Sequence, residues 1–366
     1  MKRYPGLDAF RMAAAILVVA IHTSPLASFS EELDFWLTRV LARTAVPFFF
    51  LGSGYFLLPR ILQNPRMLWK EVRKLGVLYL GAILLYLPLN WYSGQLAAPS
   101  IGKALKAFFF DGTFYHLWYF PAAVEGLLLL ALLQWLFSKP PRRSLSGSNR
   151  HSMYPAQSAT PASNLPVKKI CLGICLLLYL IGLGGDSYYG LWKHAPAVKG
   201  FYDWMFQFFG YTRNGLFFAP LFLCLGWLLR DVPRLRREFC GAGFLLCLGL
   251  MSMEAFLLRY FELQRHDSMY ICLIPCMAFL FLWLLGSRVR ASAACRSLSL
   301  TIYLIHPWMI VLVRGAAKAL HLEKFLIEQS FLHFLAVALS SCLTAVILWK
   351  IQEKWNASGR RLIWRR

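Results

Sequence analysis

Charged residues are scarce in this chain, and acidic residues are the scarcest among them. Only 15% of the 366 residues are Asp, Glu, Lys or Arg, and Asp and Glu together number 17. Soluble domains are about one quarter charged and about half apolar, whereas 58% of this chain is hydrophobic. So few charges cannot cover a folded surface in water, which excludes a soluble globular domain, and the apolar content excludes a disordered chain. We therefore expect an integral membrane protein.

Motifs of soluble enzymes are also missing. The sequence contains no Gly-x-Ser-x-Gly elbow, no P-loop, no Gly-x-Gly-x-x-Gly turn and no His-Glu-x-x-His helix. Its nine cysteines lie in or at the ends of apolar segments, and neither pair at i,i+4 spacing, Cys171/Cys175 or Cys272/Cys276, has a His or a carboxylate close in sequence. We interpret the cysteines as small packing residues and expect no metal site.

Ten apolar segments are long enough to cross a bilayer, which takes about 20 mostly apolar residues. They cover residues 7–27, 35–58, 75–92, 114–137, 168–186, 213–229, 239–260, 269–286, 296–314 and 330–350. The sequence thus predicts an all-α fold, a polytopic membrane bundle of about ten transmembrane helices that forms one domain over residues 1–366. A stretch rich in Pro and Ser, at about 138–167, is predicted to be a flexible cytoplasmic linker.

Basic residues are abundant, and their distribution alternates along the chain. Of the 39 Lys and Arg residues, 26 fall in the two tails and every second loop, nine fall in the other loops, and four lie within or at the edges of spans. Because cytoplasmic loops carry an excess of Lys and Arg, this predicts a multi-pass protein of the plasma membrane with both termini in the cytoplasm. Topology and attraction to anionic membrane lipids account for the net charge of +22, and we expect no nucleic-acid partner.

Ionisable residues within spans are costly, so each is a candidate for function. Arg11 and His22 lie 11 residues apart in the first span. On a helix this spacing places them on one face, about 16 Å apart along the axis. Asp8 precedes Arg11 by three residues and can form an ion pair with it. A membrane-edge anchor would explain Arg11 alone but not a histidine on the same stripe, so we favour a functional pair.

Further polar residues occur in or beside later spans. His116 and Glu125 are nine residues apart, which places them on opposite faces of a straight helix, although Pro121 is expected to introduce a kink between them. His306 precedes Pro307 in the middle of the ninth span, where the proline should open a gap in the helical hydrogen-bond ladder.

Four more candidates complete the set. Ser53 lies between two glycines and either packs or lines a cavity, and Arg213 opens the sixth span. Glu254 is expected to pair with Arg259 or with an arginine of another span, and Asp267 precedes the eighth span.

Five sequence segments resemble the acyltransferase-3 family of integral membrane acyltransferases, in family order across nearly the whole chain. They are GLDAFR at 6–11, the Arg11-x10-His22 spacing, PFFFLGSGY at 47–55, YHLWYF at 115–120 and IYLIHP at 302–307. Four other segments resemble the membrane part of VanT-type serine racemases: AAILVVAIHTSPL at 14–26, GGDSYYGL at 184–191, RNGLFFAP at 213–220 and HDSMY at 266–270. In such proteins a racemase domain that uses PLP follows the spans. In this chain we expect neither a racemase domain nor PLP.

The family resemblance implies transfer of an acyl group, usually acetyl from acetyl-CoA, to a hydroxyl of an extracytoplasmic glycan or related envelope molecule. In this interpretation Arg11 binds a phosphate of the acyl-CoA donor, and His22 acts as general base on the acceptor hydroxyl. The separation of about 16 Å is comparable to the length of the pantetheine arm. His116 and His306 are secondary candidates that orient the acceptor or the thioester.

Two other interpretations stay open at this point. The VanT-like segments, together with Glu125, Glu254 and Asp267, fit an uptake protein for serine or another small amino acid. A non-catalytic membrane scaffold would require all these polar groups to serve packing alone.

Overall fold

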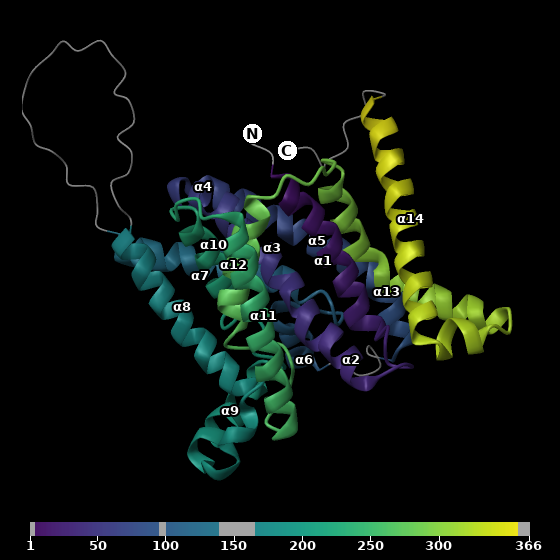
Figure 1. Ribbon diagram of the computed structural model, residues 1–366, viewed down its shortest axis with the longest axis horizontal. Coiled ribbons are helices and arrows are strands. Elements are labelled where there is room, and N and C mark those ends of the chain that lie inside the picture. Colours follow the sequence, from purple (N-terminus) through teal and green to yellow (C-terminus); the bar gives the residue numbers. More distant parts are fainter. Residues whose placement is uncertain (1–3, 95–99, 139–164, 358–366) are drawn as a thin grey trace, which may run out of the picture.

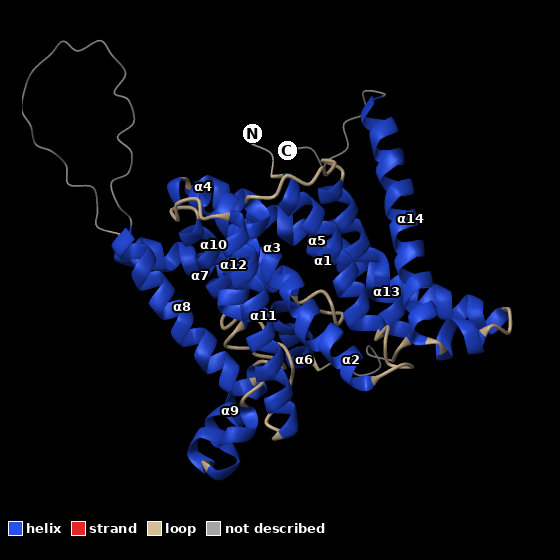
Figure 2. Cartoon of the chain, viewed as in Figure 1, coloured by secondary structure: helices blue, strands red, loops and turns tan. Residues whose placement is uncertain are grey.

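The computed structural model describes residues 4–94, 100–138 and 165–357. The linker predicted at about 138–167 falls almost entirely outside the described residues, so it stays a prediction. Within the described ranges all regular structure is helical (Figure 2).

Fourteen α-helices make up most of the described chain (Figure 1). They are α1 (Pro5–Thr23), α2 (Glu31–Phe35), α3 (Ala45–Phe56), α4 (Leu58–Gln63), α5 (Pro65–Tyr92), α6 (Ile101–Lys106), α7 (Tyr119–Phe137), α8 (Leu165–Gly185), α9 (Pro196–Phe208), α10 (Ala219–Leu229), α11 (Arg237–Tyr260), α12 (Leu273–Leu285), α13 (Cys295–Ala319) and α14 (Ser330–Ala357). Short π-helical turns occur at Trp36–Val40 (η1), Ala107–Asp111 (η3) and Lys324–Glu328 (η5), and 3₁₀ turns at Leu41–Thr44 (η2) and Tyr189–His194 (η4).

The prediction of an all-α membrane bundle is confirmed. In the described part of the chain, eight helical segments are long and apolar enough to cross a membrane, and they coincide with eight of the ten predicted spans. The other two predicted spans correspond to the shorter apolar helices α10 and α12. The side of the membrane on which the termini lie stays a prediction.

The predicted sixth span begins later than expected because its first residues form a turn. Asn214 accepts hydrogen bonds at its side-chain oxygen from the backbone N–H groups of Leu216 and Phe217, both at 3.0 Å. An Asn side chain that binds nearby backbone in this way competes with helix formation. Helix α10 therefore starts at Ala219, and Arg213 lies in the segment before the helix rather than inside a span.

The second span is a single long helical segment with an irregular middle. Residues Glu31–Gln63 run continuously enough to count as one candidate span, but the winding changes to a π-turn at Trp36–Val40 and to a 3₁₀ turn at Leu41–Thr44. Arg39 and Arg43 lie in these two turns. Because π-turns inside helices often occur at functional sites, this irregular stretch indicates where to search for one.

Helices α3 and α10 approach each other closely through two reciprocal glycine contacts. A Cβ on Gly54 would overlap the backbone of Leu223, and a Cβ on Gly226 would overlap the backbone of Leu51. Small residues at such crossings let helix backbones touch in membranes. This pair forms part of the main buried core of the bundle.

Helix α13 packs between α1 and α14. Apolar residues of all three helices, including Val19, Ile302 and Val337, form a second, smaller buried cluster. In Figure 1, α14 stands at the edge of the bundle beside α13, and the start of α1 and the end of α14 lie at the same end of the molecule.

Candidate functional site

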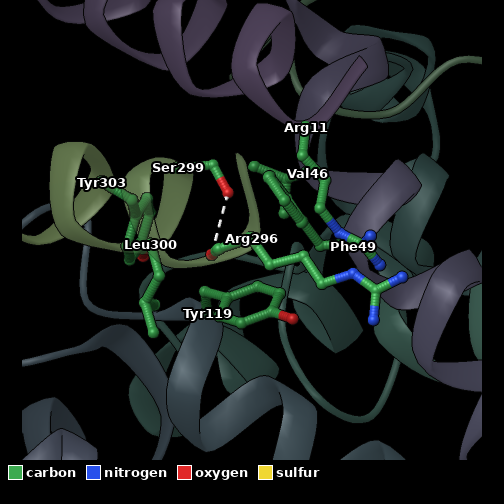
Figure 3. A pocket seen from close by; sticks show the side chains of 8 residues that line it. All are labelled: Arg11, Val46, Phe49, Tyr119, Arg296, Ser299, Leu300 and Tyr303. Atoms are coloured by element: carbon green, nitrogen blue, oxygen red, sulfur yellow. Dashed lines mark hydrogen bonds between the residues drawn. The ribbon is translucent and has the colours of Figure 1, made fainter. Parts of the chain in front are cut away.

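A small cavity lies between α1, α3, α7 and α13 (Figure 3). Its volume is about 130 Å³, and it is lined by Arg11, Val46, Phe49, Tyr119, Arg296, Ser299, Leu300 and Tyr303. Two arginines thus face a space with mainly aromatic and aliphatic walls. In Figure 3 the guanidinium groups of Arg11 and Arg296 point to the same side of this space.

One buried carboxylate holds both of these arginines. Nη1 of Arg11 donates to Oδ1 of Asp8 at 2.5 Å, and Nε of Arg296 donates to the same oxygen at 2.8 Å. Asp8 is only 3% exposed, so its charge needs these partners. The arrangement leaves a net charge of about +1 on the three groups and fixes the direction of both guanidinium planes.

The Asp8–Arg11 pair predicted from the i,i+3 spacing is confirmed. Arg296 was not a candidate in the sequence, because a basic residue at the start of the ninth span is ordinary for a cytoplasmic loop. Its role becomes visible only when α13 is placed beside α1, since Asp8 and Arg296 are 288 residues apart.

Ser53 lies next to this cavity on α3. Its side chain lies close enough to that of Tyr119, which lines the cavity, to act on the phenol group. The neighbouring Gly52 lies beside the Arg11 guanidinium, where a Cβ would be 3.8 Å from Nη2. Ser53 therefore lies beside the cavity without lining it.

Three histidines from distant segments meet further along α1 and α13. The ring centroid of His22 lies 5.3 Å from that of His306, with the two planes at 22°, and His116 lies 5.3 Å from His306. His306 is fully buried and His116 is 2% exposed. Tyr115 closes one side, with its ring 4.5 Å from that of His22.

Pro307 determines which nitrogen of His306 carries the proton. A helical residue at position 307 would donate its N–H to the carbonyl of Tyr303, but proline has no N–H. Nδ1 of His306 takes this place at 2.9 Å from the Tyr303 oxygen. Because a carbonyl oxygen only accepts, Nδ1 is protonated and Nε2 keeps a lone pair. Nε2 is buried and has no hydrogen-bond partner within the described residues.

Tyr303 connects the cavity and the histidine cluster. Its ring lines the cavity beside Arg11, while its hydroxyl donates to the backbone carbonyl of His116. The ring also lies 5.3 Å from that of His116. One side chain of α13 thus spans the space between the two groups.

A second cavity, of about 330 Å³, is almost entirely polar. It is lined by Arg39, Arg43, Tyr211, Arg213, Arg265, His266, Asp267 and Ser268. Four arginines face it, and Asp267 is the single acidic residue among these lining residues, at 3.9 Å from Nε of Arg39. We name this space the arginine cavity.

The loop that forms one wall of the arginine cavity is braced by a buried carboxylate. Oδ1 of Asp186 accepts the backbone N–H groups of Ser268 at 2.7 Å and of Met269 at 3.1 Å. Burial raises the pKa of Asp186 to about 6. His266 in the same loop has its pKa lowered to about 4, because burial and the neighbouring charges of Arg265 and Arg213 disfavour its protonated form.

The predicted geometry of His116 and Glu125 is wrong. Helix α7 begins only at Tyr119, so His116 precedes it, and the spacing argument does not apply. Pro121 lies in the first turn, where the missing N–H costs nothing, and therefore helps to start the helix rather than kinking it. Glu125 packs against Gly215, where a Cβ would overlap its side chain.

The predicted arginine partner of Glu254 is also wrong. Its carboxylate accepts the hydroxyl of Tyr188 at 2.8 Å and the backbone N–H groups of Ile271 and Cys272 at 2.6 and 2.8 Å. These N–H groups precede α12 and have no helical acceptor, so an acidic side chain stabilises them. Glu254 therefore anchors the start of α12.

All nine cysteines are free thiols, and six of them are buried. Among the described residues no group of three or more His, Cys, Asp or Glu side chains is arranged to hold a metal ion.

A comparison with known protein families identifies the family to which the chain belongs. The model of the acyltransferase-3 family, described as an acyltransferase domain, matches residues 4–350. The chain belongs to the acyltransferase-3 family. The match includes α1 and α13, which supply Arg11, His22, Arg296 and His306.

This family member is also similar to proteins named racemases. Two amino-acid racemases of Enterococcus faecalis are 38% and 36% identical to it over 94% and 98% of this chain, which correspond to 45% and 48% of the relatives. A serine/alanine racemase of Enterococcus gallinarum is 36% identical over 83% of this chain and 40% of its own length. The chain thus spans less than half the length of these curated relatives. No solved structure matches it.

Proposed function

We propose that this acyltransferase-3 family member transfers an acyl group, acetyl in the first instance, from acyl-CoA to a hydroxyl of an extracytoplasmic, carbohydrate-type acceptor of the cell envelope. One observation carries the proposal: α1 and α13 each contribute an arginine to the first cavity and a histidine to the histidine cluster. Arg11 and Arg296 share Asp8, and His22 and His306 stack. The two helices therefore run parallel, with both arginines at one end and both histidines at the other.

The spacing along both helices suits a donor that reaches from one group to the other. His22 lies 11 positions after Arg11, and His306 lies ten positions after Arg296. At 1.5 Å per residue these are about 16 and 15 Å. A CoA phosphate on the arginines would leave its thioester within reach of the histidines, because the pantetheine arm has a comparable length. Guanidinium groups bind phosphate through two parallel hydrogen bonds.

The proposed reaction assigns one role to each of the central residues. His22 takes the proton from the acceptor hydroxyl, whose oxygen attacks the thioester carbonyl carbon. The new C–O bond forms, the C–S bond breaks, and the CoA sulfur leaves with the proton that His22 returns. His306 is a positioning residue: its Nδ1 is held by the Tyr303 carbonyl, and its ring stacks on His22.

The experiment that tests this function uses the purified chain in nanodiscs with acetyl-CoA and with glycerol 3-phosphate as a hydroxyl-bearing probe acceptor. His22→Ala is expected to lower CoA release at least ~100-fold while donor binding is kept. Arg11→Ala is expected to weaken donor binding about tenfold or more. His194→Ala, a change at an exposed histidine of η4, is the matched control and should alter neither. Undiminished CoA release in His22→Ala would contradict the mechanism.

A second candidate function is uptake of serine or another small amino acid. The observation that favours it is the similarity to proteins named amino-acid and serine/alanine racemases, whose names point to small amino acids as substrates. Proteoliposomes with labelled serine test it. Saturable uptake together with an absence of acetyl-CoA binding would replace the acyltransferase proposal, and a flat uptake curve under ion and proton gradients would exclude transport of serine.

A further inference from the structure

The proposed reaction does not use the arginine cavity. Four of its lining residues are arginines, and only Asp267 among them is acidic. The Asp267 carboxylate lies 3.9 Å from Arg39, which is a loose ion pair, so it compensates at most one of the four positive charges. The lining residues of the cavity therefore carry a net charge of about +3 when His266 is neutral.

Two of these arginines are deeply placed and lack acceptors for part of their donor groups. The Arg43 side chain is more than nine-tenths buried, with 8% of the residue exposed. Nε of Arg43 and Nε of Arg213 are buried and donate to no acceptor within the described ranges. Buried charged donors are costly unless an acceptor meets them. A ligand with several anionic oxygens would supply such acceptors.

The carboxylates of Asp186 and Asp111 act on Arg213 through their charges, but neither accepts a hydrogen bond from it within the described residues. Its guanidinium lies over the rings of Trp118 and Tyr211, at 5.4 and 4.6 Å from the two centroids. Among the described residues, its side chain donates one hydrogen bond, from Nη1 to the Ser268 hydroxyl at 3.5 Å. Aromatic faces stabilise a cation and orient its plane, which leaves the edge of the guanidinium available for an oxyanion.

The arginine cavity is linked to the histidine cluster by geometry: Arg213 lies over Trp118, two residues after His116, whose ring lies 5.3 Å from that of His306. Arg213, Arg43 and Arg39 lie close enough to His22 for their charges to act on it. The Arg11–Asp8–Arg296 group lies at the other end of α1, about 16 Å away. An anion bound in the arginine cavity would thus approach His22 from the side opposite to the donor.

We propose that the arginine cavity binds the anionic group, a carboxylate or a phosphate, of a hydroxyl-bearing acceptor and thereby presents the hydroxyl to His22. This inference rests on the proposed acyl transfer for the role of the hydroxyl, but binding of the anion stands on the cavity alone. The substrate class is a hydroxylated organic anion, either a small soluble acid or the headgroup of an anionic lipid. Arg43 and Arg213 supply the charge-assisted hydrogen bonds, because their Nε groups point to no other acceptor.

The test measures protection of individual arginines from phenylglyoxal by mass spectrometry, in the full chain in nanodiscs. Three arms supply the anion: glycerol 3-phosphate or L-serine with zwitterionic lipid, and phosphatidylglycerol lipid without a soluble probe. We expect at least one arm to slow modification of Arg43 and Arg213 about fivefold or more. Arg259, whose guanidinium lies over the Phe35 ring outside the cavity, is the internal control.

The arms separate the sources of the anion. Protection by a soluble probe identifies a small acid, and protection in the phosphatidylglycerol arm identifies a lipid headgroup. Absence of protection in all three arms, or equal protection of Arg259, overturns the proposal.

Variants test anion binding in the arginine cavity independently of the proposed acyl transfer. Arg43→Gln and Arg213→Gln are expected to weaken probe binding about tenfold, whereas Arg259→Gln leaves it unchanged. If Arg213→Lys binds the probe more tightly than Arg213→Gln, the positive charge contributes to binding in addition to the geometry of the guanidinium group. His22→Ala should keep anion binding in full. Loss of CoA release in His22→Ala with retained protection supports both proposals, whereas unchanged CoA release with retained protection contradicts the role of His22 only.

Discussion

Nδ1 of His306 lies 2.9 Å from the carbonyl oxygen of Tyr303, the acceptor that a proline at position 307 leaves without its helical donor. The missing N–H of Pro307 thus determines the tautomer of His306. The lone pair of His306 is thereby directed to Nε2, which lies in the histidine cluster beside His22.

Restoring the helical N–H donor at position 307 should therefore lower activity without lowering stability. Pro307→Ala supplies an N–H that competes with His306 for the Tyr303 carbonyl, so the imidazole keeps only the more distant Ile302 carbonyl, at 3.3 Å, to fix its tautomer. We expect CoA release to fall about tenfold or more, while thermal stability does not fall, since an interior proline costs a helix about 3 kcal/mol. Pro88→Ala, which repairs the proline inside α5, is the matched control for both measurements.

Arg296 should contribute to acyl-CoA binding, although the sequence does not indicate it as a site residue. Arg296→Ala removes one of the two guanidinium groups on Asp8 and is expected to weaken acetyl-CoA binding about tenfold. The binding should also become less sensitive to salt, because one fewer phosphate contact is screened. Arg288→Ala, in the segment just before α13, is the control, and equal effects of the two changes would assign the loss to general charge rather than to the cavity.

Glu254 should prove structural. Glu254→Ala leaves the Tyr188 hydroxyl and two backbone N–H groups before α12 without their acceptor. The expected loss of stability is about 2 kcal/mol, measured by thermal unfolding in detergent, with unchanged CoA release per folded molecule. A large loss of turnover or of serine uptake at unchanged stability would instead make Glu254 part of a substrate path.

Anion binding in the arginine cavity should strengthen toward acid. Asp186, whose pKa is raised to about 6 by burial, acts electrostatically on Arg213. As the pH falls through 6 it gains a proton and loses its negative charge, so the cavity becomes more positive. His266, with a pKa of about 4, adds a further positive charge only below pH 5.

Sulfate, which stays fully ionised in this range, is the probe for the pH dependence. Its affinity should rise between pH 7.5 and 5 in the wild-type chain. Asp186→Asn should bind more tightly at pH 7.5 and show a flat profile, whereas Asp203→Asn, a change at an exposed carboxylate of α9, should leave the profile unchanged. An affinity that falls toward acid would show that the anion does not sit near Asp186.

The sequence predicts those parts of the site that stand out against an apolar background. Asp8, Arg11, His22 and His306 are polar residues within apolar runs, and helical geometry alone pairs Asp8 with Arg11. Arg296 does not stand out, because basic residues are expected where a span meets the cytoplasm. The partner of Glu254 could not be predicted, since backbone N–H groups leave no mark in a sequence.

The arginine cavity could not be predicted for a different reason. Its residues come from three segments, 39–43, 211–213 and 265–268, and only the packing of α11 and α12 beside the second span brings them together. Arg213 was a candidate in the sequence, but Arg265 lies in a loop, where an arginine is ordinary, and the convergence of the four arginines depends on contacts of segment 39–43 with segments more than 150 residues away.

The reciprocal glycine contacts between α3 and α10 limit how this molecule can move. Gly54 touches the backbone at Leu223, and Gly226 touches the backbone at Leu51, so a sliding step along either axis would drive a side chain into the opposite main chain. These two helices must therefore travel as one rigid body. Any conformational change in the bundle therefore has to displace other helices against this pair, which serves as the fixed frame of the membrane domain.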